Sequence, residues 1–164
     1  TCALPIFFTR PVSKVTVYSS KIVFLLEIIF ISSLIGYLTF LLSGFALDKL
    51  LPGYEFSSYN VNTLMASYFS YLFIALSAVS FIQYNLSLIF KSFVLPIGFA
   101  SLMTIFGIIA QNKDYAYLIP YSTVWRLNYC VYSGIINFSK SEYASIAYVP
   151  FFIVISFFVF IRKK

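Results

Sequence analysis

Four long apolar stretches, separated by short polar breaks, constrain the fold of this chain more than any other feature. They cover residues 22–44, 64–86, 93–110 and 146–161. A helix needs about 20 apolar residues to cross the roughly 30 Å of hydrocarbon in a bilayer. Three stretches meet that length and the fourth comes close, so the pattern predicts a protein that crosses a membrane several times.

The composition argues against a soluble domain. Hydrophobic residues make up 61% of the chain and charged residues only 10%, against roughly 25% charged residues in soluble domains. The apolar runs are continuous, as at residues 28–31 and 151–155, whereas strands of a membrane barrel alternate apolar and polar residues. Because backbone groups in lipid must be satisfied within the chain, we predict an all-α fold, a polytopic transmembrane helical bundle of four spans that forms one domain over residues 1–164.

The distribution of charge predicts how the bundle is oriented. All charged residues are basic in three places: the segment 1–21, the turn between the second and third spans, and the C-terminus. They are Arg10, Lys14, Lys21, Lys91, Arg162, Lys163 and Lys164. The predicted outer loops, 45–63 and 111–145, balance basic against acidic residues: Lys49, Lys113, Arg126 and Lys140 against Asp48, Glu55, Asp114 and Glu142. Loops rich in Lys and Arg stay in the cytoplasm. Both termini are therefore predicted to be cytoplasmic, and the net charge of +6 reports topology rather than a nucleic-acid partner.

The outer loop 111–145 contains a pattern typical of a short helix. Pro120 breaks the chain, Ser122 or Thr123 can cap a helix just after it, and apolar residues then recur at helical spacing: Val124, Leu127, Val131 and Ile135. We predict an amphipathic helix that lies in the outer membrane interface or dips into it. An ordinary irregular loop is the alternative.

The residues needed for most enzyme chemistry are missing from the sequence. There is no histidine, no glycine-rich phosphate loop and no pair of carboxylates within a predicted span. Cys2 and Cys130 have no metal-ligand spacing and fall on opposite predicted sides of the membrane. We therefore expect no enzymatic activity, no cofactor and no metal site in this chain.

Glu27 is the ionisable residue placed within a predicted span. It follows Lys21 by six residues, which corresponds to a depth of about 9 Å along a helix. A charge in hydrocarbon is costly and marks a candidate functional site. The alternative is that Glu27 reaches the cytoplasmic interface or pairs with a basic residue of a neighbouring helix.

Two further sets of residues in the second span are candidates for function. Gln83 and Asn85 form a polar patch with Tyr84 near the inner end of the span, and they either line a pathway or lie in the interface. Small residues, including Ser67, Ser70 and Ser77, let membrane helices approach closely. They favour packing within this subunit, with a subunit interface as the alternative.

The N-terminal segment combines an apolar turn with basic residues. Leu4 and Pro5 are followed by Arg10, Lys14, Tyr18 and Lys21, which opens the first span. With Thr1, this order resembles the cytoplasmic stretch K-T-x-x-x-L-P-x-x-R-x-x-x-x-x-x-K that precedes the third of six spans in type-2 ATP-binding-cassette (ABC) transporter permeases. The later layout is similar too, with an outer loop, a tight inner turn near Lys91, helical outer material and a short basic C-terminus.

The resemblance implies that the four stretches correspond to spans three to six. The resemblance also implies two further spans upstream of Thr1, and because the chain starts at Thr1 without a methionine, we expect that an N-terminal part is missing. Members of the family pair two permease subunits, alike or different, in the bacterial plasma membrane, and each binds a cytoplasmic ATPase subunit. The resemblance implies that Leu4, Pro5, Arg10 and Lys14 lie beside the ATPase-coupling surface. The residue usage suggests a Gram-positive bacterium and an exporter of the lantibiotic or bacteriocin immunity or bacitracin-resistance kind.

Two other functions remain open at this level. One is a stand-alone immunity or accessory membrane protein with no ATPase, which would bind its ligand through the aromatic outer loop. The other is an intramembrane enzyme, which the missing histidines and paired carboxylates disfavour.

Overall fold

The computed structural model describes residues 13–51, 53, 61–90, 92, 94–132 and 140–162. Within these residues all regular secondary structure is helical, and no strand occurs. The elements in chain order are α1 (Lys14–Leu50), α2 (Val61–Ile89), α3 (Val94–Ala110), the 3-10 helix η3 (Asp114–Leu118), α4 (Pro120–Tyr132) and α5 (Lys140–Arg162). The prediction of an all-α fold is confirmed for the described part of the chain.

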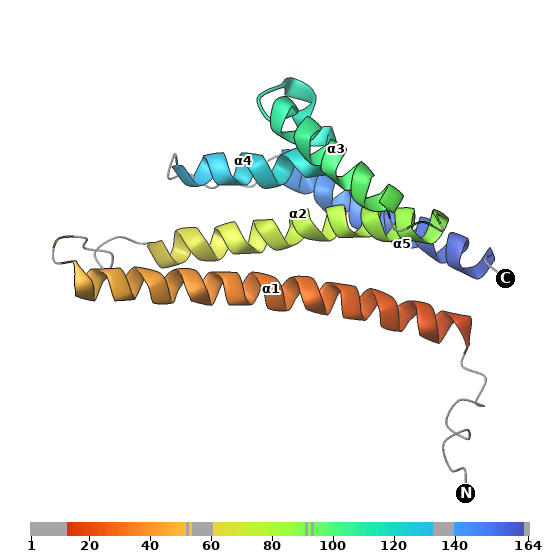
Figure 1. Cartoon of the computed structure of the whole chain (residues 1–164), viewed down its shortest axis with the longest axis horizontal. Helices are drawn as coiled ribbons and strands as arrows, with labels where there is room; N and C mark the ends of the chain where they lie inside the picture. The colour runs from red at the N-terminus through yellow and green to blue at the C-terminus, as the bar shows by residue number, and fades with distance from the viewer. Residues whose placement is uncertain are drawn as a thin grey trace, which may run out of the picture.

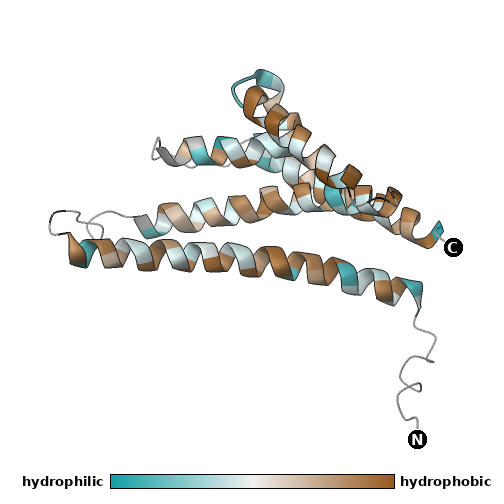
Figure 2. Cartoon of the chain, in the orientation of Figure 1, coloured by the Kyte–Doolittle hydropathy of each residue, from teal (hydrophilic) through white to brown (hydrophobic). Residues whose placement is uncertain are grey.

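Three of these helices are long and apolar enough to cross a membrane. They are α1, α2 from Asn62 onward, and α5, and Figure 2 shows apolar residues along most of their length. The predicted span 93–110 coincides with α3, which has 17 residues. At 1.5 Å per residue, α3 is about 26 Å long, somewhat short of the roughly 30 Å of hydrocarbon. The structure thus supports three spans of the predicted four by length, and the full count is not confirmed.

The long helices extend beyond the predicted spans. α1 begins at Lys14 because the side chain of Ser13 accepts a hydrogen bond from the backbone N–H of Thr16 at 3.1 Å, which satisfies one free donor of the first turn. α5 begins at Lys140, within the stretch predicted as outer loop. Parts of the segments 1–21, 45–63 and 111–145, which were predicted to lie outside the spans, are therefore helical. Polar first and last turns continue the apolar helices into them.

α4 is the helix predicted within the outer loop, and it starts one turn earlier than expected. Pro120 is its first residue, a position where the missing N–H of proline leaves no bond unmade. Ser122 does not cap the helix: its hydroxyl donates to the carbonyl oxygens of Ala116 at 2.6 Å and Ile119 at 2.8 Å. Leu127 is fully buried, so α4 packs into the molecule. Ile135 lies outside the described residues.

α2 is the central helix of the bundle. It packs against α1, α4 and α5 (Figure 1), and Ala75, Ala78 and Phe81 on it are completely buried. Small side chains let neighbouring helices come close to its backbone. The first turn of α1, the α2–α3 turn and the end of α5 lie at the same end of the bundle. This end is called the inner end below, after the predicted topology.

α3 and α4 meet at an unusually close contact. A Cβ atom added to Gly107 of α3 would lie 2.9 Å from the backbone carbonyl carbon of Tyr121 and 3.0 Å from the backbone nitrogen of Ser122. Any larger residue would force the two helices apart. Gly107 therefore fixes where the α3–η3–α4 unit turns back onto the bundle.

Candidate functional site

The predicted polar patch of α2 is divided between two faces of the helix. Gln83 and Tyr84 line a cavity of about 600 Å³ near the inner end of α2. Asn85 is on another face, where its side-chain amide donates to the carbonyl oxygens of Phe81 at 2.9 Å and of Phe152 in α5 at 3.0 Å. Asn85 therefore joins α2 to α5, whereas Gln83 and Tyr84 form part of the cavity wall.

The cavity is an open hollow between α1, α2 and α3. Its walls combine uncharged polar side chains with apolar ones: Ser80, Gln83, Tyr84, Ser87 and Ser92 with Leu25, Val79, Phe90, Pro96 and Ile97. Its volume lies within the range of about 300–1,000 Å³ found for small-molecule sites. The hydroxyl of Tyr84 is buried and has no partner among the described residues. The cavity can thus accept an apolar body that carries a few neutral hydrogen-bonding groups.

Gln83 also links the cavity to α4. Its amide donates a hydrogen bond to the hydroxyl of Tyr121, a buried residue in the first turn of α4. Burial raises the pKa of Tyr121 above its ordinary value, and the bond from Gln83 acts in the opposite direction. This hydrogen bond connects the first turn of α4 to one wall of the cavity.

An ion pair between half-buried Arg126 and fully buried Glu142 joins α4 to α5. The guanidinium of Arg126 bonds the carboxylate of Glu142, whose side chain is 0% exposed, and the hydroxyl of Ser141 donates to the same carboxylate oxygen at 3.3 Å. The hydroxyls of Thr123 and Ser145 are also buried, and neither has a partner among the described residues. A buried pair of this kind depends on both members, since removal of one leaves an uncompensated charge.

Sequence reasoning missed this ion pair because it counted both residues as charges of an outer loop. Two signals point to it in retrospect. Arg126 lies off the apolar face of the predicted helix that follows Pro120, and Glu142 lies one turn before the last apolar stretch. Opposite charges on two adjoining helices can meet, but only the fold shows that these two do.

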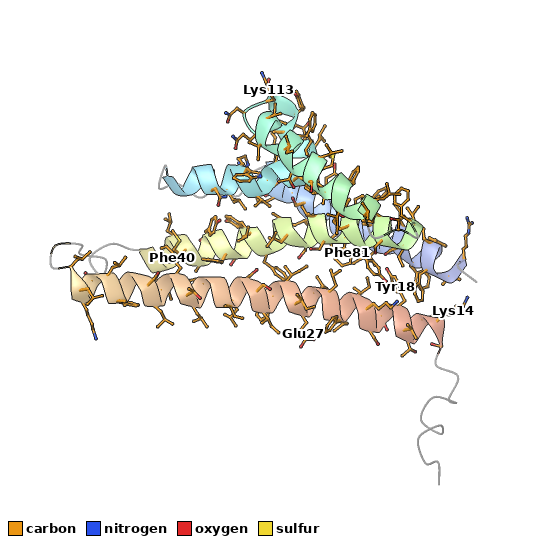
Figure 3. All side chains as sticks on the ribbon, viewed as in Figure 1. Lys14, Tyr18, Glu27, Phe40, Phe81 and Lys113 are labelled. Atoms are coloured by element: carbon orange, nitrogen blue, oxygen red, sulfur yellow. The ribbon has the colours of Figure 1, made fainter. Side chains whose placement is uncertain are left out.

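The inner end of α1 is joined to the inner end of α5. The hydroxyl of Tyr18 donates to the carbonyl oxygen of Ile153 at 2.6 Å and lies 2.6 Å from the hydroxyl of Ser156. Its ring contacts Phe157 and Phe160, with centroids 5.3 Å and 5.6 Å away. Figure 3 shows Tyr18 and Lys14 on this side of α1.

Lys14 and Lys21 strengthen the same junction. The ammonium of Lys14 donates to the carbonyl oxygen of Ile161 at 3.3 Å, one of the last carbonyls of α5, and that of Lys21 lies 5.2 Å from the ring centroid of Phe160. Lys14 is the member of the predicted coupling set that the structure describes. Leu4, Pro5 and Arg10 lie outside the described residues.

The remaining predicted residues are dispersed. Glu27 is exposed on the face of α1 that points away from the other helices (Figure 3), so the structure does not bring it together with Gln83 or Asn85. Ser77 is buried within the chain, whereas Ser67 is half-buried and Ser70 exposed. Each of these three hydroxyls donates to a carbonyl oxygen of its own helix. Ser67 donates to Thr63, Ser70 to Ala66 and Ser77 to Phe73.

Comparison of the chain with protein-family models, with curated proteins and with solved structures found no significant match. Among the described residues there is also no group of three His, Cys, Asp or Glu side chains that could hold a metal ion. The interpretation of the cavity and its neighbours therefore rests on their chemistry.

Proposed function

We propose that the chain is the membrane-spanning permease subunit of an ABC exporter in a bacterial plasma membrane, with both termini in the cytoplasm. It moves an amphipathic substrate, such as an antimicrobial peptide or another drug, across or out of the membrane. A separate subunit hydrolyses the ATP, and a second permease subunit completes the transporter. The family resemblance of the N-terminal segment supports this proposal together with the structural features that follow.

The observation that carries the proposal is the junction between the inner ends of α1 and α5. The segment that resembles the coupling motif leads directly into α1, and Lys14 and Tyr18 on its first turns are bonded to α5. A force applied to this segment by an ATPase therefore moves both helices together. A junction with buried hydrogen bonds and ring contacts is stiff enough to transmit such a movement, since interiors of this kind are bistable rather than continuously deformable.

The same connection continues toward the other end of the molecule. α5 carries Glu142, which is paired with Arg126 of α4, and α4 contacts the cavity through Tyr121 and Gln83. A shift of α5 relative to α2 thus changes the position of α4 and the width of the cavity. ATP binding on the partner would bias the subunit between two such arrangements.

The cavity suits the proposed cargo. Among the described residues, its walls offer hydroxyl and amide groups with apolar side chains and no charged side chain. An amphipathic molecule can bury an apolar segment there while its backbone or hydroxyl groups form hydrogen bonds. The substrate enters from the side of the bundle, because the cavity is open between α1, α2 and α3.

The experiment that tests the proposal is purification of the full-length protein in mild detergent, with mass spectrometry of the proteins that accompany it. A stoichiometric nucleotide-binding subunit, lost when Arg10 and Lys14 are both changed to Glu, is the expected result. A preparation that contains no ATPase, or an unchanged ATPase yield and export in the double variant, would contradict the coupling role.

A second candidate function is supported by the exposed aromatic residues near α4. Trp125 and Tyr143, next to Arg126 and Glu142 in sequence, are exposed, and so is Tyr115 in η3. They suit a stand-alone immunity or accessory protein that binds its ligand at this surface. The purification experiment separates the two functions, since the second one requires no ATPase.

A further inference from the structure

Two fully buried hydroxyl groups, one on α4 and one on α5, have no hydrogen-bond partner among the described residues. They belong to Thr123, which is 0% exposed, and to Ser145, which is 1% exposed. The Nε atom of Arg126 is also buried and has no partner in the same part of the chain. The large majority of buried polar side-chain atoms in proteins bind a protein group or an ordered water molecule. Each of these three atoms therefore requires a partner.

α4 and α5 pack against each other in antiparallel directions. The hydroxyl of Tyr148 in α5 donates to the carbonyl oxygen of Leu118, just before α4, at 2.8 Å. Arg126, further along the chain in α4, is bonded to Glu142, which is closer to the start of α5. This order determines which residues of the two helices lie opposite each other.

The two hydroxyls occupy the same level of this antiparallel pair. Thr123 is three residues before Arg126, and Ser145 is three residues after Glu142. Residues three apart lie on the same helix face, and three residues correspond to about 4.5 Å along the helix axis. Both hydroxyls are therefore displaced from the ion pair in the same direction, on the two faces that the ion pair joins. The ion pair, with Nε of Arg126, bounds this level on one side.

The hydroxyls lie away from the helix ends that flank residues 133–139. Tyr132, the last residue of α4, follows Arg126, and Lys140, the first residue of α5, precedes Glu142. Both ends are thus on the other side of the ion pair. The level of the two hydroxyls belongs to the packed helical part of the chain.

α2 faces α4 in this region with a small apolar side chain. Tyr68 of α2 is bonded to Asn128 of α4, and Gln83 of α2 is bonded to Tyr121. The part of α2 between these two contacts therefore runs beside α4. Ala75 lies seven residues after Tyr68, hence on the same face of α2, and is completely buried. Its methyl group forms no hydrogen bond and leaves room that a larger side chain would fill.

The charges beside the two hydroxyls select a small neutral ligand. Arg126 and Glu142 neutralise each other, and the carboxylate already accepts hydrogen bonds from Arg126 and Ser141. A metal cation would meet two hydroxyl oxygens and a guanidinium, whereas hard cations take about six or more oxygen ligands. An anion would lie beside the carboxylate of Glu142. Because both hydroxyl-bearing residues are almost completely buried, only a ligand of the size of water fits between them.

We propose that an internal water site lies between α4 and α5, where one or two water molecules bind the hydroxyls of Thr123 and Ser145 and accept a hydrogen bond from Nε of Arg126. Buried waters typically form about three hydrogen bonds to buried polar groups that otherwise have no partner, and these three atoms supply that number. The bond to Nε also offsets part of the cost of burying the ion pair. The inference goes beyond the proposed function, because it requires neither an ATPase nor transport.

The test is a structure of the full-length protein at a resolution that shows ordered water. We expect a water peak at hydrogen-bond distance, about 2.7–3.2 Å, from the hydroxyl oxygens of Thr123 and Ser145, with Nε of Arg126 bonded to the same water or to an adjacent one. The absence of such a peak would overturn the proposal, as would a direct bond between the two hydroxyls. A peak with several oxygen ligands at about 2.3–2.6 Å would identify a metal cation and would overturn it as well.

Thr123→Val then tests whether the hydroxyl holds the water. The change removes the hydroxyl at nearly constant shape and leaves Arg126 and Glu142 in place, so the water peak should be lost. Thr104→Val is the matched control and should leave the peak unchanged, because the hydroxyl of Thr104 donates to the carbonyl oxygen of Ala100 in its own helix at 2.8 Å. An unchanged peak in Thr123→Val would contradict the assignment of this hydroxyl to the site. If Thr123→Val does not fold, the structure of the unchanged protein still decides the proposal.

Discussion

α1 and α2 are neighbouring apolar helices of similar composition, yet they differ in how much of their side-chain surface is buried. α2 buries Ala75, Ala78 and Phe81 completely and bonds its polar residues Gln83 and Asn85 to α4 and α5. α1 leaves most of its apolar window exposed and directs its carboxylate away from the bundle. Hydropathy alone makes the two helices equivalent. Packing shows that α2 is the core of this chain and that most of the apolar surface of α1 lies outside this core.

The two carboxylates Glu142 and Glu27 give the sharpest form of this comparison and the largest expected effect. Arg126→Met removes the cation that is bonded to the buried carboxylate of Glu142 and should lower the free energy of unfolding by about 3–5 kcal/mol. Glu27→Gln should change it by less than about 0.5 kcal/mol in the isolated chain, because Glu27 contacts no other described helix. Denaturant unfolding in detergent micelles measures both.

The double variant Arg126→Met with Glu142→Leu provides the control. Replacement of both members by apolar residues should recover most of the stability that the single change removes. If Arg126→Met is as mild as Glu27→Gln, the ion pair does not hold α4 to α5, and the path from α5 to the cavity loses its support.

Phenylalanine is used in both helices, and its removal should have very different effects. Phe81→Ala in α2 removes a fully buried ring and should cost about 3 kcal/mol, at the lower end of the usual range because small neighbours can move into the space. Phe24→Ala in α1 removes a ring that is 63% exposed and should stay within about 0.5 kcal/mol. Thermal unfolding of the two variants in the same detergent tests this. Equal losses would mean that α1 is as much a part of the core as α2.

The sequence predicted the helical fold well because hydropathy over about 20 residues reflects a single physical requirement, the transfer of backbone into lipid. The apolar stretches lie within α1, α2, α3 and α5, and the helix after Pro120 is present. The ends of the helices were less predictable. Ser13 extends α1 and Lys140 begins α5, since capping and polar first turns are not visible in hydropathy.

The candidate site was predicted only in part, because side-chain partners depend on tertiary contacts. Gln83 and Asn85 are two residues apart and thus point in different directions on a helix, one to the cavity and the other to α5. Glu27 was predicted as a candidate only because it is an ionisable residue within a predicted span. The role of Tyr18 needed the fold, since its partners Ile153 and Ser156 are more than a hundred residues away in sequence.

Tyr18 joins α1 to α5 through hydrogen bonds of its hydroxyl, and loss of that hydroxyl should have an intermediate effect. Tyr18→Phe keeps the ring contacts with Phe157 and Phe160 but loses the hydrogen bonds of the hydroxyl, which should cost about 1–2 kcal/mol. Tyr115→Phe, at an exposed position, is the matched control. If α1 transmits force to α5, Tyr18→Phe should also reduce export while ATPase binding persists. Unchanged export at reduced stability would restrict Tyr18 to a structural role.

The smallest effect on stability separates the two polar residues of α2. Asn85→Leu removes the bonds to Phe81 and Phe152 and should cost about 1 kcal/mol. Gln83→Leu removes one bond to the buried Tyr121 and should cost less, yet it replaces a polar side chain of the cavity wall with an apolar one. If the proposed export function holds, Gln83→Leu should change which compounds are exported, and Asn85→Leu should lower the export of all of them together through its effect on stability. Measured resistance profiles that change in parallel for both variants would show that the cavity does not select the substrate. α2 would then be a structural core on both of its polar faces, and the functional surface of the chain would have to be sought on α1 and around α4.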